Sequence, residues 1–441
     1  MSAPSVLGPL AEACSQVREA GADDAVAGVM PQYVASPADV AEASAVMRAA
    51  AAAGLAVIPR GTGSTLGWGS PPARCDLVID MSRMNQVLEH ASGDLVAQVQ
   101  AGARLDELAE VLAAAGQRLA LDPPRAGTVG GVLASAAAGP LRLRYGTGRD
   151  LLIGVTVIRA DGTVARSGGK VVKNVAGYDL GKLFAGSQGT LGLIAEATFR
   201  LHPAPGAASY LTLDCPDGAA ADAALVTAVD SPLAPSAAEI DREARGAPFR
   251  VGILLEGDPD GLAERSARMS DLLGGTGSGA VVVSATPPPW WGLGPAAAAD
   301  GTVIRIAFWA GELASVLGCI DAAGRAAGLD PLVGGSAAAG VICAAVGEGA
   351  APAAVAEFVT ALRGVAALRG APALRGAAAL RGAVGSAQPS RGSVVVLHAP
   401  ADVRGLVDLW GPVPSLGLMR AVKDQFDPDH RMAPGRFAGG I

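Results

Sequence analysis

The 441-residue sequence predicts an α+β protein with two domains and a C-terminal segment. Three observations support this fold class. A strand–helix–strand pattern spans residues 32–58, and further strands of alternating polarity follow as far as residue 202. Beyond the prolines at 203 and 205, four more strands are interleaved with helical patterns. We therefore expect domains at 1–205 and 206–400 and a C-terminal segment at 401–441.

The first domain opens with the strand–helix–strand pattern. Ser36 is expected to cap a helix that begins at Pro37, because serine favours the N-cap and proline the first helical position. Gly54 should end this helix, and the apolar run "LAVIP" should form the next strand. The glycine-rich stretch "PRGTGSTLGWG" follows that strand directly.

The remaining elements are expected from apolar periodicity and turn residues. In the first domain we expect strands at 77–79, 95–99 and 191–202, a helix from 106 that Gly116 ends, and a hairpin that turns at 160–162. In the second domain we expect strands at 208–215, 249–257, 302–310 and 393–400, and helices at 219–229 and 259–273.

Composition excludes several classes of protein. The net charge of -7 and the lack of a Lys/Arg-rich run argue against a nucleic-acid binder. The first residues show no signal-peptide pattern, and no apolar run reaches the roughly 18 residues of a membrane span. The five cysteines are far apart and form no C-x-x-C, which favours reduced thiols over a zinc or iron–sulfur site. We expect a cytoplasmic protein, either unattached or membrane-associated through partners.

Two glycine-rich stretches, 59–69 and 122–148, are candidates for a ligand site. Glycine lets a backbone approach closely, and consecutive N–H groups in such loops form anion-binding concavities. Neither stretch spells G-x-G-x-x-G or G-x-x-x-x-G-K-[ST], and each could be a tight turn without a ligand. Together they could face one extended anionic ligand.

The motif "ALRG" recurs at 361, 367, 373 and 379, within a low-complexity stretch at 361–382. A six-residue period is too short for a solenoid. We expect a surface helix or loop with solvated arginines, and a functional basic patch is the alternative. The arginines are Arg363, Arg369, Arg375 and Arg381.

Three segments in order carry a family resemblance: "PRGTGSTLGWG", "GTVGGVLASAAAGPLRLRYGTG" and "GSQGTLGLIAEATFRLHP". Over residues 28–204 they resemble the FAD-binding domain of the vanillyl-alcohol oxidase/p-cresol methylhydroxylase (PCMH) superfamily. More narrowly, "GGKVVKNVAGYDLGKLFAGSQGTLGLI" resembles the E-type FAD-binding subunit of bacterial glycolate oxidases. The end "FDPDHRMAPGRFAGG" is similar to the C-terminal segment of these oxidases, with Ala433 where asparagine is expected.

The resemblance implies a two-subdomain PCMH-type FAD-binding domain, an α+β cap or substrate domain, and a C-terminal segment that packs back on the flavin domain. The loop from Arg60 to Ser64 would hold the FAD pyrophosphate with its amides, and Leu191 would pass beside the flavin. No histidine occurs at 57–72, so FAD should be bound non-covalently. The implied cofactor-binding residues are Pro59, Arg60, Gly61, Thr62, Gly63, Ser64, Gly127, Thr128, Gly130, Gly131, Ser135, Gly139, Gly189, Gly192 and Ile194.

Catalytic residues are not evident. Oxidation of a 2-hydroxy acid needs a base for the hydroxyl and a cation for the carboxylate. Lys173 and Tyr178 could approach the flavin, or could make structural contacts at the edge of its domain. His398 lies in "LHAPADV", which lacks the H-x-G-D-G-N-x-H metal signature of related dehydrogenases, and we expect no metal. His90 is expected in a polar turn and His202 at the domain boundary.

The resemblance implies an FAD-binding subunit of a glycolate oxidase-like complex. It would oxidise a small 2-hydroxy acid such as glycolate and pass electrons to a partner. The implied partners are a second flavoprotein subunit and an iron–sulfur subunit. Because the metal signature is absent, a flavin-bearing scaffold subunit without its own turnover is the alternative.

Overall fold

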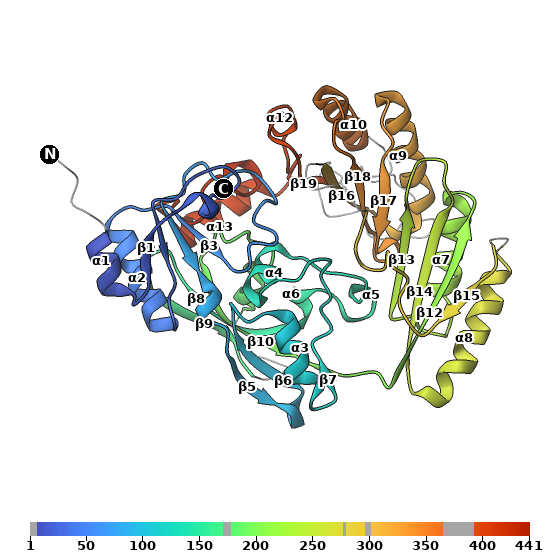
Figure 1. Ribbon diagram of the computed structural model, residues 1–441, viewed down its shortest axis with the longest axis horizontal. Coiled ribbons are helices and arrows are strands. Elements are labelled where there is room, and N and C mark those ends of the chain that lie inside the picture. Colours follow the sequence, from blue (N-terminus) through green and yellow to red (C-terminus); the bar gives the residue numbers. More distant parts are fainter. Residues whose placement is uncertain (1–6, 171–177, 277–278, 296–300, 365–391) are drawn as a thin grey trace, which may run out of the picture. The chain divides into compact units, whose positions relative to one another are not determined.

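The computed structural model describes residues 7–170, 178–276, 279–295, 301–364 and 392–441 (Figure 1). The chain divides into two compact units. Unit 1 comprises Met1–Ala204 and Ser415–Ile441, and unit 2 comprises Pro205–Pro414. The predicted α+β class is confirmed, and residues 401–414 lie in unit 2 rather than with the rest of the C-terminal segment.

Unit 1 contains a four-stranded sheet in the order β1-β2-β4-β3. Strands β2, β4 and β3 are parallel, and α2 connects β2 to β3, with β4 between them. Both faces of this sheet are buried, which explains why its strands are apolar runs without alternation. The elements are α1 (Leu7–Ala13), β1 (Val17–Glu19), β2 (Tyr33–Ala35), α2 (Val40–Ala52), β3 (Val57–Arg60) and β4 (Leu77–Asp80).

Helix α2 begins later than the sequence predicts. Its N-cap is Asp39, whose carboxylate accepts hydrogen bonds from the backbone N–H groups of Ala41 and Glu42. The expected cap at Ser36 is therefore wrong. A carboxylate at the N-cap satisfies two unpaired amides and also opposes the positive end of the helix dipole, which a serine hydroxyl does less strongly.

A second sheet of unit 1 has five antiparallel strands in the order β5-β6-β10-β8-β9. The expected hairpin is confirmed, because β8 pairs with β9 around residues 160–162. The two sheets share one apolar core, which includes Met47, Val99 and Phe199. The elements are β5 (Val87–Ala91), β6 (Val96–Gln100), α3 (Leu105–Ala113), β7 (Gln117–Arg118), α4 (Val129–Ser135), α5 (Arg142–Tyr145), α6 (Gly148–Leu151), β8 (Leu152–Ile158), β9 (Val164–Gly168), β10 (Leu193–Arg200) and β11 (His202–Pro203).

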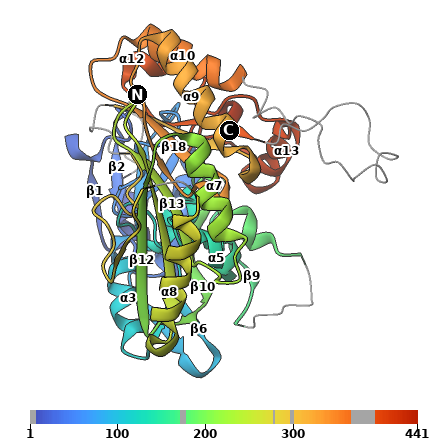
Figure 2. The same cartoon turned by 90° about the vertical axis from the view of Figure 1, so that its right-hand side faces the viewer.

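Unit 2 is built on an eight-stranded antiparallel sheet in the order β15-β12-β14-β13-β17-β18-β16-β19. Helices α7, α8, α9 and α10 lie along one face of this sheet (Figure 2). The elements are β12 (Ala207–Cys215), α7 (Gly218–Val229), β13 (Ala237–Arg242), β14 (Phe249–Gly257), α8 (Pro259–Gly274), β15 (Val282–Ser284), β16 (Thr302–Ala307), α9 (Leu313–Ala327), β17 (Leu332–Gly335), β18 (Val341–Val346), α10 (Pro352–Gly364), β19 (Ser393–His398) and α12 (Ala401–Arg404).

The sequence predicts four of these eight strands. The unpredicted strands include β13, "AAEIDR", and β17, "LVGG". Alanine, acidic residues and glycine have low β-propensity, so neither segment resembles a strand by itself. Neighbouring strands on both sides hold β13 in the sheet through a continuous ladder of backbone hydrogen bonds.

Most of the ALRG stretch lies outside the described residues, but Arg363 at the end of α10 is described. Its guanidinium donates to the backbone carbonyl of Val394 at 3.2 Å and of Asp408 at 2.6 Å. Burial lowers the pKa of Arg363. The prediction that this arginine is solvated is therefore wrong, because its side chain holds α10 against the chain around β19.

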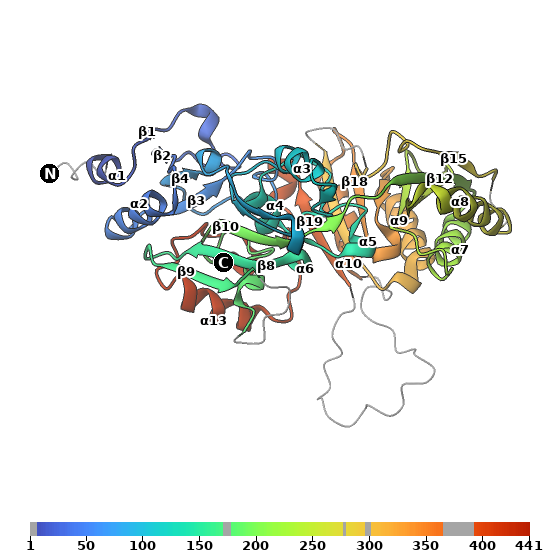
Figure 3. The ribbon, with the colours of Figure 1, turned by 90° about the horizontal axis from the view of Figure 1, so that it is seen from below.

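The C-terminal helix α13 (Leu416–Phe426) lies next to the five-stranded sheet (Figure 3). The ring of Phe426 meets that of Phe184 edge-on, with their centroids 5.6 Å apart. After α13, the chain joins the edge of the four-stranded sheet, where Val57 donates to Arg431 and accepts from Ala433. In this way 415–441 completes both the core and the sheet edge of unit 1.

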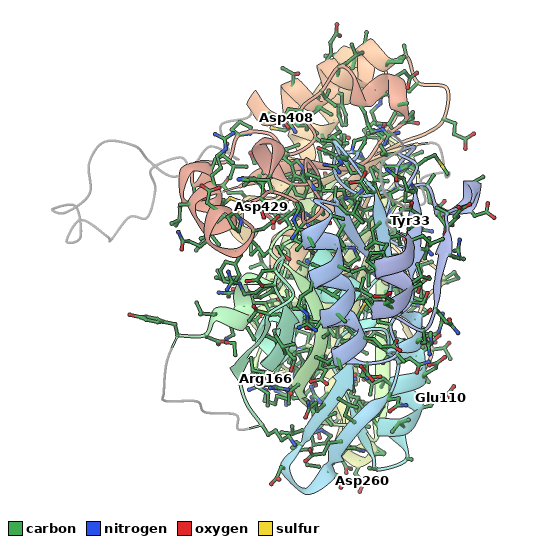
Figure 4. All side chains as sticks on the ribbon, turned by 90° about the vertical axis from the view of Figure 1, so that its left-hand side faces the viewer. Tyr33, Glu110, Arg166, Asp260, Asp408 and Asp429 are labelled. Carbon is green, nitrogen blue, oxygen red and sulfur yellow. The ribbon has the colours of Figure 1, made fainter. Side chains whose placement is uncertain are left out.

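A buried ion pair anchors this segment. The Lys423 ammonium donates to the Asp427 carboxylate at 2.6 Å and to the backbone carbonyls of Thr190 and Met432 at 2.7 and 2.9 Å. The carboxylate also accepts from the N–H of Met432. Asp427 is fully buried, whereas Asp429, two residues later, is exposed (Figure 4).

Replacing Lys423 with methionine should destabilise unit 1, because the Asp427 carboxylate would remain buried without its counter-charge. The expected loss is about 3–5 kcal/mol, measured by denaturant or thermal unfolding. Lys182→Met is a matched control, since that lysine pairs with Asp179 at the surface. Equal unfolding midpoints for the two variants would contradict this account of Lys423.

Candidate functional site

Unit 1 contains a pocket whose walls are three backbone loops. It encloses about 770 Å³ of empty space when its open mouth is counted. The three walls are the loop after β3, the start of α4, and the loop before β10. The lining residues are Ile58, Pro59, Arg60, Gly61, Thr62, Gly63, Ser64, Thr65, Leu66, Met81, Ala101, Thr128, Gly130, Gly131, Ala134, Ser135, Gln188, Gly189, Gly192, Leu193, Ile194 and Arg436.

The first wall presents unpaired amides. Within the described chain, no group accepts a hydrogen bond from the backbone N–H groups of residues 62–65. Gly63 has φ +79°, a left-handed conformation that glycine adopts without strain. Four consecutive amide donors beside a pocket form a concavity suited to an anion.

The side chain of Arg60, at the base of this loop, is already paired. Its guanidinium contacts the carboxylates of Asp24 and Asp80, each at 2.9 Å. Arg18 and, to a lesser extent, Arg60 hold the pKa of Asp24 well below its ordinary value. The side chain of Arg60 therefore fixes the end of β3, and its backbone is the part that is available to a ligand in the pocket.

The second wall leaves no room for a side chain at Gly61 or Gly130, where it meets neighbouring segments. A Cβ on Gly61 would lie 2.0 Å from the Thr128 hydroxyl, and one on Gly130 would lie 2.8 Å from the Cβ of Ala101. The Thr128 hydroxyl caps α4 by accepting from the N–H of Gly131 at 3.3 Å. Glycine is thus required where the first loop meets α4.

The third wall is the turn before β10. Gln188 has φ +55° and donates its N–H to the carbonyl of Ala134 at 2.8 Å, which ties the turn to α4. Gly189 has φ +75° and faces Pro59, and Gly192 has φ +152°. The carbonyl of Thr190 in this turn is the one that Lys423 binds, so the C-terminal segment supports this wall from behind.

The structure brings most of the expected cofactor residues together around this pocket. Gly127 and Gly139 are the exceptions, and Leu191 is buried outside the lining. A Cβ added to Gly127 would lie 3.3 Å from the hydroxyl of Ser64 in the first loop. At Gly139 a Cβ would lie 1.7 Å from the carbonyl of Asp122, so this glycine allows two backbone segments to approach closely.

The neighbouring Asp122 carboxylate accepts from the backbone N–H of Leu141 at 3.1 Å. Desolvation raises the pKa of Asp122 to about 7. The carboxylate therefore ties the backbone at residue 141 to the segment at residue 122, outside the pocket lining.

Sequence reasoning missed one charged residue of the pocket, Arg436. It follows Pro434 and Gly435 in the C-terminal segment and is 4% exposed. Local sequence gives no indication that an arginine near position 436 reaches a site built by residues 58–194. The parallel bridge between Val57 and Met432 brings them together.

Of the two catalytic candidates, only Tyr178 lies in the described part of the chain. Tyr178 is 91% exposed and is absent from the pocket lining. Lys173 lies outside the described residues. The position of Tyr178 gives no geometric evidence for a catalytic role.

The histidines make structural contacts. His90 lies in strand β5 rather than in a turn, with its Nε2 2.9 Å from the Gln117 side-chain oxygen. His202 packs its ring on Tyr145 at 4.7 Å, and burial lowers its pKa. His398 is the last residue of β19. Across the described ranges, no three His, Cys, Asp or Glu side chains gather as metal ligands would.

Comparisons with known proteins agree with a cofactor pocket in unit 1. Residues 31–168 match the family model of the FAD binding domain. The chain is 37% identical over 178 residues to glycolate oxidase subunit GlcD of Bacillus subtilis, covering 40% of this chain and 38% of that protein. It is 34% identical over 188 residues to D-2-hydroxyglutarate dehydrogenase of Xanthomonas citri pv. viticola, covering 42% and 40%.

It is also 32% identical over 178 residues to D-lactate dehydrogenase [cytochrome] 1 of Saccharomyces cerevisiae, covering 40% of this chain and 30% of that protein. The chain thus aligns with less than half the length of these curated relatives. Among solved structures, p-cresol methylhydroxylase superposes with a TM-score of 0.72 at 15% identity, covering 98% of this chain and 96% of that chain. Alkyldihydroxyacetonephosphate synthase gives 0.70 at 17%, covering 98% and 85%.

At these identities the structural likeness concerns the fold alone. The protein therefore has the α+β fold of PCMH-type flavoenzymes, with an FAD-binding domain and a domain built on a large antiparallel sheet. Among the helices that the structure describes, none has the length and apolar character needed to cross a bilayer.

Gly61→Ala should disrupt the junction of the first and second walls, because the new methyl group would overlap the Thr128 hydroxyl. Overpacking of this kind is expected to destabilise unit 1 by about 1–3 kcal/mol, seen as a lower thermal midpoint. Gly93→Ala is the matched control, since a Cβ there meets nothing within 4 Å. Unchanged stability of Gly61→Ala would show that the junction tolerates a side chain.

Proposed function

We propose that this chain is the FAD-binding subunit of a glycolate oxidase-like complex that oxidises a 2-hydroxy acid, such as glycolate to glyoxylate, and passes the electrons to a partner subunit. The observation that carries the proposal is the pocket of unit 1, where glycine loops and unpaired amides surround a space in a matched FAD-binding domain. Relatives named for glycolate, D-lactate and D-2-hydroxyglutarate support the substrate class.

The pocket fits FAD on chemical grounds. The amides of residues 62–65 would hold the diphosphate, and the glycines of all three walls let the cofactor lie against backbone. Apolar side chains of Ile58, Leu66 and Leu193 would exclude water from the ring system. Because 57–72 contains no histidine, we propose that FAD is bound non-covalently.

FAD, when bound, supplies the acceptor for the hydride that leaves the hydroxyl-bearing carbon. The protein must then orient the acid and accept the hydroxyl proton. Lys173 and Tyr178 remain candidates for these roles to be tested by mutagenesis. We propose that unit 2, with its eight-stranded sheet, serves as the cap or substrate domain.

The electron acceptor is proposed to be another chain. The five cysteines are spread over the sequence without a cluster motif, so an iron–sulfur centre would belong to a partner. The resemblance of residues 168–194 to the E-type FAD-binding subunit of glycolate oxidases supports a complex that also contains a second flavoprotein. The same resemblance supports placing the complex in the cytoplasm or at a membrane through those partners.

A scaffold role is the second candidate. In "LHAPADV", His398 stands without the remaining residues of H-x-G-D-G-N-x-H, and His398 ends a strand of unit 2. On this alternative the chain would hold FAD within the complex and turn over no substrate by itself.

Turnover of the purified, FAD-loaded chain distinguishes the two candidates. With glycolate or D-lactate, an oxidoreductase subunit should reduce a dye acceptor. Without the dye, anaerobic addition of the same substrate should bleach the flavin absorbance of the chain near 450 nm. Proteins that co-purify from the native host should include an iron–sulfur protein. Flavin reduction only after partner subunits are added would favour the scaffold, and a chain that binds no flavin would refute both.

Acid precipitation tests the mode of attachment. We expect the yellow cofactor to appear in the supernatant, because no histidine of the first loop is available for a covalent bond. Mass spectrometry of the pellet should show the mass of the unmodified chain. Flavin that remains with the precipitated protein would overturn the non-covalent proposal.

A further inference from the structure

The guanidinium of Arg436 lies in the wall of the pocket with few partners. Its Nη2 donates to the carbonyl of Trp68 at 2.9 Å, at the end of the first glycine loop. Its Nη1 is buried, and no described group accepts a hydrogen bond from it. The backbone here is fixed, because Ala73 donates its N–H to the carbonyl of Pro434 at 2.8 Å.

No carboxylate in the described ranges forms an ion pair with Arg436. The titratable group that acts on it is the thiol of Cys75, and because burial raises the pKa of this thiol to about 12, the thiol stays neutral. Desolvation lowers the pKa of Arg436 to about 10. Arg60, which also lines the pocket, forms ion pairs with two carboxylates.

A buried charge without a counter-ion is unfavourable, and a ligand of opposite charge removes that penalty. Residues 62–65, whose amides are unpaired, line the same pocket as Arg436, and Trp68 belongs to their loop. Amide donors on this loop, together with a buried cation that hydrogen-bonds to the loop, form a site for a group with more than one negative charge. The diphosphate of a dinucleotide has that character, whereas the ring system of a flavin is neutral.

We infer that Arg436 is the counter-charge of the cofactor diphosphate, supplied to the glycine-loop pocket by the C-terminal segment. The inference rests on the proposed binding of FAD and adds a residue to it. Arg436 thereby selects a dinucleotide over the bare flavin, and it makes the C-terminal segment part of the cofactor site. It is a binding and positioning residue, with no role in moving the proton or the hydride.

The test uses the full chain with its flavin removed, as wild type and as Arg436→Gln and Arg436→Lys. Affinities for FAD, ADP and riboflavin are measured by titration calorimetry or by quenching of flavin fluorescence. Because Arg436→Gln removes a charge-assisted contact, it should weaken the binding of FAD and of ADP by about 10- to 100-fold. Arg436→Lys should recover part of the affinity, and riboflavin should bind all forms alike.

The control is Arg420→Gln, because Arg420 is exposed in the same segment and donates to the carbonyl of Gly439. It should leave all three affinities unchanged. Stability provides a second measurement. The flavin-free Arg436→Gln protein should unfold at the same temperature as wild type or higher, since a buried unpaired charge is gone, while the rise in midpoint on adding FAD should shrink.

Three results would overturn the inference: unchanged FAD affinity in Arg436→Gln, an equal loss for riboflavin and FAD, or a large destabilisation of the flavin-free variant that Lys does not rescue. The proposed function fails separately. A wild-type chain that binds ADP through Arg436 but not FAD would refute the flavin proposal alone, and one that binds neither would refute both.

Discussion

The arrangement of unit 1 depends on the buried hydrogen bonds of the Lys423 ammonium. This ammonium joins the Asp427 carboxylate, the carbonyl of Thr190 in the third pocket wall and the carbonyl of Met432 at the sheet edge. A charged group in an apolar core is least unfavourable when each of its donors has an acceptor. One side chain therefore fixes the pocket wall and the C-terminal segment in the same geometry.

The pocket is built from backbone because its walls touch one another. Where the first loop meets α4, a methyl group on Gly61 would overlap Thr128, so side chains are excluded at the place where amides are exposed. Recognition then depends on N–H groups whose directions the fold sets. The only guanidinium of the lining without a carboxylate partner among the described residues, that of Arg436, adds the charge that amides lack.

Local patterns in the sequence predict those parts that local physics determines. The apolar run before Arg60, the hairpin at 160–162 and the glycine at 116 were sufficient to place strands, a turn and a helix end. Strand β17, "LVGG", could not be predicted, because only its neighbours make it extended. The position of Arg436 in the pocket could likewise not be predicted, because it results from the pairing of Val57 with Met432, which are far apart in the sequence.

Unit 1 is formed by two segments of the sequence, and residues 205–414, which form unit 2, separate these segments along the chain. During synthesis, the glycine loops emerge more than two hundred residues before Lys423 and Arg436. Domains generally fold as units as the chain emerges. Unit 2 can thus fold while unit 1 still has an unpaired edge at Val57, and the pocket is complete only once residue 436 has left the ribosome. Under the proposed function, cofactor binding would then wait for the C-terminal segment.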